Sequence, residues 1–239
     1  MSTPIVHPGN DEAIAQLVAD AGILANHELI ERMVATSLGF GGDGASKLDL
    51  KISSAALDEM REAFRLFESH NGAPKVTVFG SARTAHEGPL YQQAHDVTER
   101  LAERGWMAVT GAGPGIMEAA ASGAGPDRAL GVSIRLPFEE LPSDSVTGSS
   151  HHVTMKYFFT RKLMLVKESS GFVCLPGGFG TLDEMFELLT LQQTGKAEPV
   201  PIVLLDRPGG SFWTRPPQFA QAALETGRYL SPGGIDRLL

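Results

Sequence analysis

GFVCLPGGFGTLDE, residues 171–184, contains the three parts from which one class of fold is built. Gly171–Leu175 is a short apolar run, typical of a strand that is buried on both faces of a sheet. A loop with three glycines follows it, and a helix is predicted from about Thr181. A strand, a loop and a helix in this order form the repeating unit of parallel α/β sheets.

The same order recurs along the chain from residue 75 onward. Helices are predicted at about 89–104, after the GAGPG run at 111–115, at about 157–168, from 181 and at about 212–225. Short apolar strands precede or separate them at KVTVF 75–79, MAVT 107–110, ALGVSI 129–134, HHVTM 151–155 and PIVLL 201–205. We therefore expect an α/β fold over residues 74–239, a Rossmann-like parallel sheet with helices on both faces.

Residues 1–73 have a different rhythm and predict a helical N-terminal extension. A helical pattern over 11–38 is interrupted at 22–26, and GFGGDGAS at 39–46 predicts a flexible connection. A second helical pattern follows, in which Leu57, Met60, Phe64 and Phe67 recur at three- and four-residue steps and share one face. We expect that face to pack on the main domain or on a second subunit.

Composition excludes several classes of protein. The chain has 239 residues and a net charge of −8, whereas proteins that coat nucleic acid carry basic faces. One cysteine, Cys174, allows neither a disulfide framework nor a cysteine zinc site, and the seven histidines show no zinc spacing. We find neither a secretory leader nor an apolar run that would span a bilayer, so the expectation is a cytoplasmic protein with no metal, nucleic acid or membrane partner.

The glycines of TGAGPGIME, residues 110–118, first suggest a dinucleotide site, but the match is poor. Ile116 occupies the third glycine position of G-x-G-x-x-G, and Arg135 stands where the acidic residue that binds ribose is expected. The glycines also allow a tight turn, and Pro114 suits the first turn of a helix. We still expect this loop to contact a ligand, because it follows a strand at the carboxyl edge of the sheet.

PGGFGT, residues 176–181, lacks the lysine that a nucleoside triphosphate loop places after its last glycine. What remains is a glycine loop that leads into the N-terminus of a helix. Free N–H groups of residues 178–181 and the helix dipole suit a single phosphate. The sequence therefore favours a monophosphate over a triphosphate.

Two charged residues near this loop each have two interpretations. Thr181 and Glu184 form T-x-x-E, a capping box in which the glutamate only bonds back to the start of its helix. Glu184 could equally be a catalytic acid or base. Arg161 interrupts the apolar run FFTRKLML, residues 158–165, as a solvated charge with a buried stem or as an arginine directed at phosphate or developing negative charge.

The pair of motifs resembles one known family. PGGFGTLDE fits PGGxGTxxE and RKLML fits RKxxM, as in the Lonely Guy family of cytokinin-activating phosphoribohydrolases, whose members are often labelled lysine decarboxylases. FGSAR, GAGPGIMEAA and GVSIRLPFEE extend the resemblance from residue 75 to the C-terminus. The chain differs from the family pattern at Ala112, where a glycine is common, and near Ser122, where an asparagine is common; its long N-terminus resembles the longer bacterial members.

The resemblance implies hydrolysis of a nucleoside 5′-monophosphate, AMP or a cytokinin riboside monophosphate, to a free base and ribose 5-phosphate, without a cofactor. It implies a homo-oligomer, either a dimer or a hexamer built from dimers. Its catalytic pair maps onto Arg161 and Glu184. The predicted substrate-binding residues are Gly80, Ser81, Arg83, Gly113, Glu118, Met164, Gly177, Gly178, Gly180 and Thr181.

Two other functions remain open at this point. A nucleotide-binding sensor or carrier could use the same fold without catalysis, because a fold does not determine a function. A lysine decarboxylase would need pyridoxal phosphate and a lysine that forms its Schiff base, for which Lys162 is the one candidate beside the motifs.

Overall fold

The computed structural model describes residues 10–136 and 151–214. The chain divides into two compact units, residues 1–57 and 58–239, and the division falls within one long helix. Each unit is described by itself.

The N-terminal unit is helical. It contains α1 (Asn10–Asp20), α2 (His27–Gly42) and the first part of α3 (Lys47–Glu68). The predicted break between the first two helices is present, with Gly22 and Asn26 both at positive φ. The predicted connection at 39–46 is wrong in its first half, because α2 continues to Gly42 through glycines with ordinary φ, and the chain turns only at Gly44.

The second unit is built on six parallel strands: β1 (Lys75–Phe79), β2 (Met107–Thr110), β3 (Ala129–Ile134), β4 (His152–Met155), β5 (Gly171–Cys174) and β6 (Ile202–Leu204). Their order across the sheet is β4-β3-β2-β1-β5-β6, and every neighbouring pair is parallel. The chain therefore moves outward from β1 to β4 and then crosses back to β5 on the other side of β1. This reversal places a crevice at the carboxyl ends of β1 and β5, where ligands bind in such sheets.

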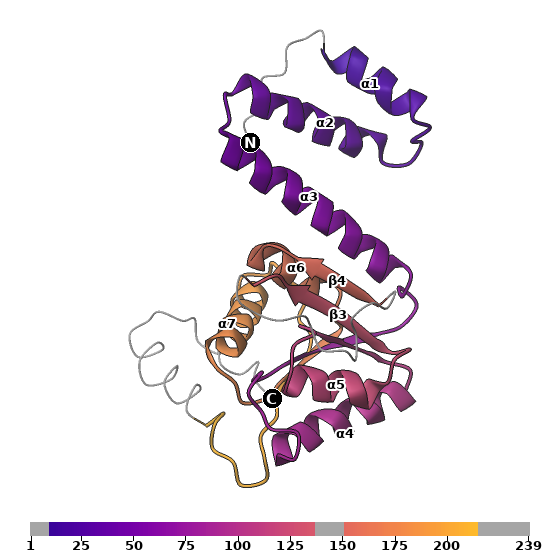
Figure 1. The fold of residues 1–239 in the computed structure, drawn as a ribbon. Helices are drawn as coiled ribbons and strands as arrows, with labels where there is room; N and C mark the ends of the chain where they lie inside the picture. Colours follow the sequence, from indigo (N-terminus) through magenta and orange to yellow (C-terminus); the bar gives the residue numbers. More distant parts are fainter. Residues whose placement is uncertain (1–9, 137–150, 215–239) are drawn as a thin grey trace. The chain divides into compact units, whose positions relative to one another are not determined.

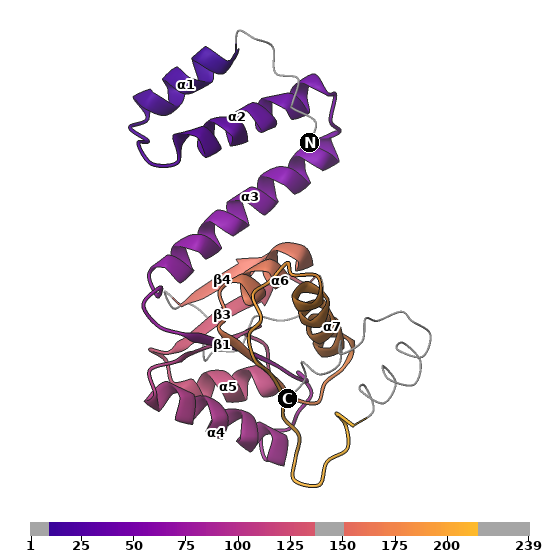
Figure 2. The same cartoon turned by 180° about the vertical axis from the view of Figure 1, so that it is seen from behind.

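Helices cover both faces of the sheet, as the sequence predicts (Figure 1, Figure 2). One face carries α4 (Pro89–Glu103) and α5 (Ile116–Ala124), and the other carries α6 (Phe158–Lys167) and α7 (Phe179–Gln193). Alternate strand residues supply the two cores: Phe172 and Cys174 of β5 pack on the α6–α7 side, whereas Val173 packs on the α4–α5 side. The Rossmann-like α/β prediction is confirmed.

The C-terminal part of α3 belongs to the core on the α6–α7 side. Ala63, Leu66 and Phe67 are buried there and Met60 packs against them. Two of the four residues predicted to share a packed face, Leu57 and Phe64, are 40% and 43% exposed. The buried face of α3 is centred on the neighbouring Ala63, and not on the large side chains of Leu57 and Phe64.

Several element boundaries refine the sequence prediction. Helix α7 begins at Phe179 and not at Thr181, and the helix predicted at 212–225 lies almost wholly outside the described residues. Within the described ranges, no helix is both long and apolar enough to cross a membrane.

Candidate active site

Three sequence runs meet at the carboxyl edge of the sheet because their strands are neighbours. GSAR follows β1, GAGPG follows β2 and PGGFGT follows β5, and β1 lies between the other two. Ser81 joins all three: its N–H donates to the carbonyl of Pro176 at 3.2 Å, and its own carbonyl accepts from the N–H of Ile116 at 3.1 Å. Backbone hydrogen bonds thus connect the three loops at the edge of the sheet.

Arg161 lies in the first turns of α6 and is only 8% exposed. Its Nε donates to the carbonyl of Val132 in β3 at 2.8 Å. The backbone of Gly111 abuts the guanidinium so closely that a Cβ at this position would overlap Nη2. Burial lowers the pKa of Arg161, and the nearby Glu184 opposes that shift. The first interpretation of this arginine, a solvated surface charge, is therefore wrong.

Glu184 forms an ion pair with this arginine. Nη1 of Arg161 donates to Oε1 of Glu184 at 3.1 Å, and the glutamate side chain is 14% exposed. Burial raises the pKa of Glu184 to about 7; the charge of Arg161 acts in the opposite direction, and that of Asp183 adds to the rise. A carboxyl group with a pKa near neutrality can both take and release a proton at physiological pH.

The capping-box interpretation of Glu184 does not match the start of α7. Gly178 is the N-cap and Phe179 the first helical residue, so Thr181 is already in the third position. A capping box from Thr181 to Glu184 requires Thr181 at the cap itself. Glu184 therefore extends toward Arg161 from within the helix and leaves the helix end without a side-chain cap.

The glycines of PGGFGT are of two kinds. A Cβ on Gly177 would overlap the side chain of Thr181, so this glycine allows close packing within the loop. A Cβ on Gly178 or Gly180 would meet no atom within 4 Å, and neither has a positive φ. Packing and backbone conformation thus leave these two glycines unexplained, and both face open space.

Backbone N–H groups at this helix end are available to a ligand. The N–H of Leu182 is the first to bond within the helix, to the carbonyl of Gly178 at 3.1 Å. The N–H groups of the three residues before it have no partner inside the helix, as at every helix N-terminus. Together with the helix dipole, they form an anion site of the size of one phosphate.

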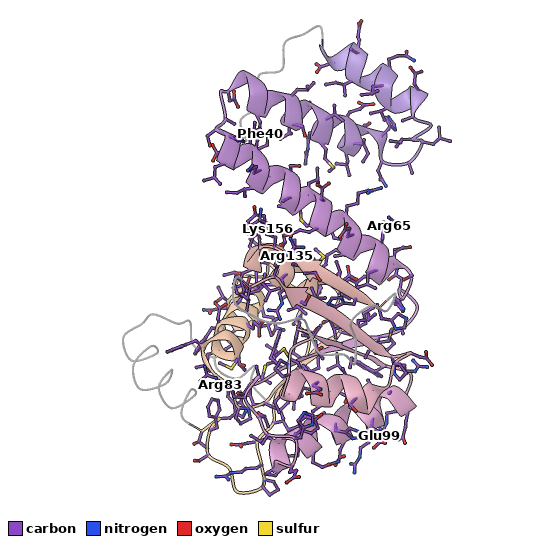
Figure 3. The ribbon with its side chains drawn as sticks, viewed as in Figure 1. Phe40, Arg65, Arg83, Glu99, Arg135 and Lys156 are labelled. Atoms are coloured by element: carbon purple, nitrogen blue, oxygen red, sulfur yellow. The ribbon has the colours of Figure 1, made fainter. Side chains whose placement is uncertain are left out.

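The other predicted site residues are divided between the edge and the core. Arg83 is exposed on the loop after β1, and its backbone N–H donates to Oγ of Ser81 at 3.1 Å. Figure 3 labels Arg83 near this edge, together with Arg135, which follows β3, and Lys156, which follows β4. Glu118, in the first turn of α5, has its Oε2 3.1 Å from Nε2 of His86.

Three further predicted residues contribute packing. A Cβ on Gly80 would lie 2.5 Å from the side chain of Ile116, so this glycine lets α5 approach β1. Gly113 faces the tip of Met117 in the same way. Met164 is fully buried in the core on the α6–α7 side.

Sequence reasoning missed the contact between Gly111 and Arg161, and the role of β3 in holding the arginine. The signal for the first is visible only in retrospect: Gly111 is the first glycine of a run that was assigned to turn geometry. The second has no signal, because the carbonyl of Val132 that accepts from Arg161 belongs to the backbone.

Lys162 does not suit a Schiff base to pyridoxal phosphate. It bonds to Asp183 at 3.1 Å and to Glu187 at 2.6 Å. Partial burial alone would lower the pKa of Lys162, but the hydrogen bonds and charges of these two carboxylates outweigh it and raise the pKa. A Schiff-base lysine needs the opposite shift, so the residues beside the motifs do not fit this cofactor.

Comparison with known proteins matches the same region. A family model described as possible lysine decarboxylase matches residues 115–237. The cytokinin riboside 5′-monophosphate phosphoribohydrolase of Mycobacterium tuberculosis is 32% identical over 176 residues, which are 69% of this chain and 86% of that protein. One of the same name from Arabidopsis thaliana is 27% identical over 135 residues, 55% of this chain and 63% of that protein.

Among solved structures, the molybdenum cofactor binding protein of Rippkaea orientalis superimposes with a TM-score of 0.45 and 25% identity. The superposition covers 63% of this chain and 84% of that one.

Proposed function

This chain belongs to the family of cytokinin riboside 5′-monophosphate phosphoribohydrolases, and from that membership we propose that it hydrolyses the N-glycosidic bond of a nucleoside 5′-monophosphate to a free base and ribose 5-phosphate. The observation that carries the proposal is the buried pair of Arg161 and Glu184 beside an open glycine loop. A buried carboxyl group with a pKa near 7 supports proton transfer, and the loop supports recognition of one phosphate.

In this proposal the 5′-phosphate binds the N-terminus of α7, where Gly178 and Gly180 leave room beside the free N–H groups. Ser81 and Arg83 follow β1, across the crevice from this loop, and contribute further donors. The ribose then lies over the strand ends, close to Glu184. Gly80, Gly113 and Met164 shape the site from behind by packing.

Cleavage of an N-glycosidic bond develops positive charge on the ribose, in an oxocarbenium-like transition state. A nearby carboxylate stabilises that charge, and the same group can accept a proton from the attacking water. Glu184 is assigned both roles. The hydroxyl of the water is added to the ribose, and the departing base gains one proton, which balances the proton that Glu184 takes from the water. Arg161 holds Glu184 in place, since the guanidinium is fixed on its other side by the carbonyl of Val132.

The pKa of Glu184 gives a sign to the pH dependence. A general base must be deprotonated, so kcat/KM is expected to rise with pH through about 7 and then to level off. Asp183→Asn should move the midpoint to lower pH, because the charge of Asp183 raises the Glu184 pKa. The substrate phosphate also titrates near pH 6, but its titration cannot respond to Asp183. A midpoint that stays in place in this variant would exclude Glu184 as the titrating group.

The direct test is a panel of nucleoside 5′-monophosphates assayed for release of the base, with AMP and a prenylated adenosine monophosphate included. The matching nucleosides are the controls. We expect release from the monophosphates and little from the nucleosides. Equal rates on both would refute the phosphate-binding assignment, and tight binding of AMP without release of adenine would favour a sensor or carrier.

Self-association is part of the proposal. Apolar side chains of α6 and α7 are exposed to 40–55%: Phe158, Phe159, Leu163 and Phe186. Phe179, beside the glycine loop, is 93% exposed. Apolar groups gathered on one pair of helices favour a second copy of the chain as the partner. Light scattering is expected to give a dimer or a multiple of one, and a monomer at micromolar concentration would contradict this.

A cytoplasmic location also remains a prediction.

A further inference from the structure

Glu59 is a buried carboxyl group for which the proposed chemistry has no use. It lies on α3 and is 6% exposed, on the helix face that also buries Ala56 and Ala63. Glutamate is rarely buried to this extent without partners, because removing its charge from water is unfavourable. Its partners therefore indicate its purpose.

All of the hydrogen bonds that the structure gives Glu59 come from the start of α6. The N–H of Lys156 donates to Oε2 at 2.6 Å, and the N–H of Tyr157 donates to Oε1 at 3.3 Å. The hydroxyl of Thr160 also bonds to Oε1. Figure 3 labels Lys156 beside the N-terminus of α6, whose first residue is Phe158.

These contacts supply what α6 lacks by itself. Tyr157, its N-cap residue, makes no side-chain capping bond. A helix N-terminus has several N–H groups without partners and carries the positive end of the helix dipole. The carboxylate of Glu59 accepts from one of these N–H groups, that of the N-cap residue Tyr157, and places a negative charge near the positive end of the dipole. Glu59 therefore acts as a partial cap that α3 provides for α6.

The capped turn is the turn that holds Arg161. The N–H of Arg161 bonds to the carbonyl of Tyr157 at 3.2 Å, and Thr160 is the residue before it. The guanidinium has little freedom at its other end, between Val132 and Glu184. A shift of the first turn of α6 would therefore pull the guanidinium away from Glu184.

We propose that Glu59 is a positioning residue, which fixes the first turn of α6 and thereby holds Arg161 against Glu184. The inference rests on the proposed function, since Arg161 and Glu184 are its catalytic pair. It assigns to α3 a part in the reaction, although no residue of α3 belongs to the strand-end crevice.

The test is Glu59→Gln, assayed with AMP as substrate. Glutamine has nearly the same shape, but it loses the charge and directs an NH₂ group toward N–H donors. We expect kcat to fall about tenfold to 100-fold, since a misplacement of about 1 Å can cost about 100-fold, while KM changes less than about twofold. Glu62→Gln is the matched control: this residue is exposed one turn further along α3, and its change should leave both constants as they are.

The pH profile separates positioning from stability. The charge of Arg161 lowers the pKa of Glu184, as does Lys162, whereas Asp183 raises it. If the guanidinium of Arg161 moves away from Glu184, the pKa of Glu184 rises, and the midpoint of kcat/KM against pH should move to higher pH. Loss of the negative charge of Glu59 would by itself move the midpoint to lower pH, so the sign is diagnostic.

Thr160→Val is the second variant, because it removes one donor to Glu59 and keeps the charge. It should lower kcat less and move the midpoint in the same direction, and it serves alone if the glutamine variant fails to fold. An unchanged kcat, or a midpoint that stays in place or moves to lower pH, would overturn the inference. Wild-type enzyme that releases no base from any monophosphate would instead overturn the proposed function.

Discussion

The two glycine loops at the edge of the sheet look alike in sequence and differ in what their glycines face. In GAGPG, after β2, a Cβ on Gly111, Gly113 or Gly115 would overlap or crowd protein atoms: Arg161, Met117 and the backbone at 81–82. In PGGFGT, after β5, a Cβ on Gly178 or Gly180 would meet nothing within 4 Å. The first loop is thus packed against the protein, whereas the second is open to a ligand.

The difference shows that a glycine-rich loop is not in itself a sign of a binding site. Glycine is needed where another backbone or side chain approaches closely, or where φ is positive. Gly115 meets both conditions, with φ at 68° and the carbonyl of Ser81 behind it. A glycine that meets neither condition and lies at the carboxyl edge of the sheet, such as Gly180, leaves room for a ligand there.

Each loop is next to one member of the catalytic pair, and substitutions in this pair are expected to have the largest effect on activity. Arg161 is held against the packed loop, whereas Glu184 lies in the helix that follows the open one. Glu184→Gln keeps the size of the side chain and removes the carboxylate, so we expect base release from AMP to fall at least about 100-fold. Steady-state kinetics at pH 8 measures this.

Asp183→Asn is the control for the loss of one negative charge in the same turn. Asp183 is 61% exposed and its pairing with Lys162 is a surface contact, so activity at pH 8 should remain close to that of the wild type. Survival of activity in Glu184→Gln would remove Glu184 from the mechanism. Arg161→Lys should also lower the rate, because a point charge cannot bond to Val132 and Glu184 at once as the guanidinium does.

The second prediction tests the packed loop. Gly111→Ala places a methyl group against Nη2 of Arg161, so the guanidinium must move. We expect kcat for AMP to fall about tenfold or more, because small displacements of catalytic groups are costly. Thermal stability should also fall.

Gly123→Ala separates these two effects. A Cβ at Gly123 would overlap the carbonyl of His95 on the neighbouring α4. Gly123 is near the C-terminus of α5, on the other face of the sheet from α6, which carries Arg161. This variant should melt at a lower temperature and retain the kcat of its folded fraction. Similar kcat values for the two variants would mean that the contact between Gly111 and Arg161 has no catalytic effect.

The sequence was sufficient for the sheet and insufficient for the connections across it. Apolar runs and loop residues place strands and helices nearly where they are, because burial on both faces leaves a clear pattern. The contacts of Arg161 could not be predicted in this way: its acceptor in β3 is a backbone carbonyl, and Gly111 is distant in sequence. The burial of Glu59 could not be predicted either, since the sequence pattern alone does not distinguish a buried glutamate that caps another helix from a solvated charge.

The third prediction tests the open loop. Gly180 is in the first turn of α7 with ordinary φ, and alanine favours a helix over glycine by about 0.8–1.0 kcal/mol in helix interiors. Gly180→Ala should therefore raise the melting temperature, yet its methyl group occupies the space assigned to the phosphate. We expect KM for AMP to rise by at least about tenfold if one charge-assisted hydrogen bond is lost.

Gly39→Ala is the matched control for this trade. Gly39 also lies in a helix, α2, with nothing within 4 Å of its added Cβ. It should give a similar gain in stability and an unchanged KM. Equal KM values for the two variants would mean that Gly180 does not face the substrate.

The smallest expected effect concerns Ala112, the residue of the packed loop that stands where the family pattern commonly has a glycine. Ala112 is buried, with φ at 56°, in the left-handed region that L-residues other than glycine enter at a cost of about 1–2 kcal/mol. Ala112→Gly relieves that strain but adds freedom to the unfolded chain, worth about 0.4–1 kcal/mol in the opposite direction. We expect a net gain of about 0.5–1 kcal/mol in the free energy of unfolding, measured by denaturant titration, with kcat unchanged. Ala121→Gly, in the interior of α5, should instead destabilise the fold. If both variants lose stability alike, the packed loop holds Ala112 without strain, and close packing is sufficient to explain the glycines on either side of it, Gly111 and Gly113.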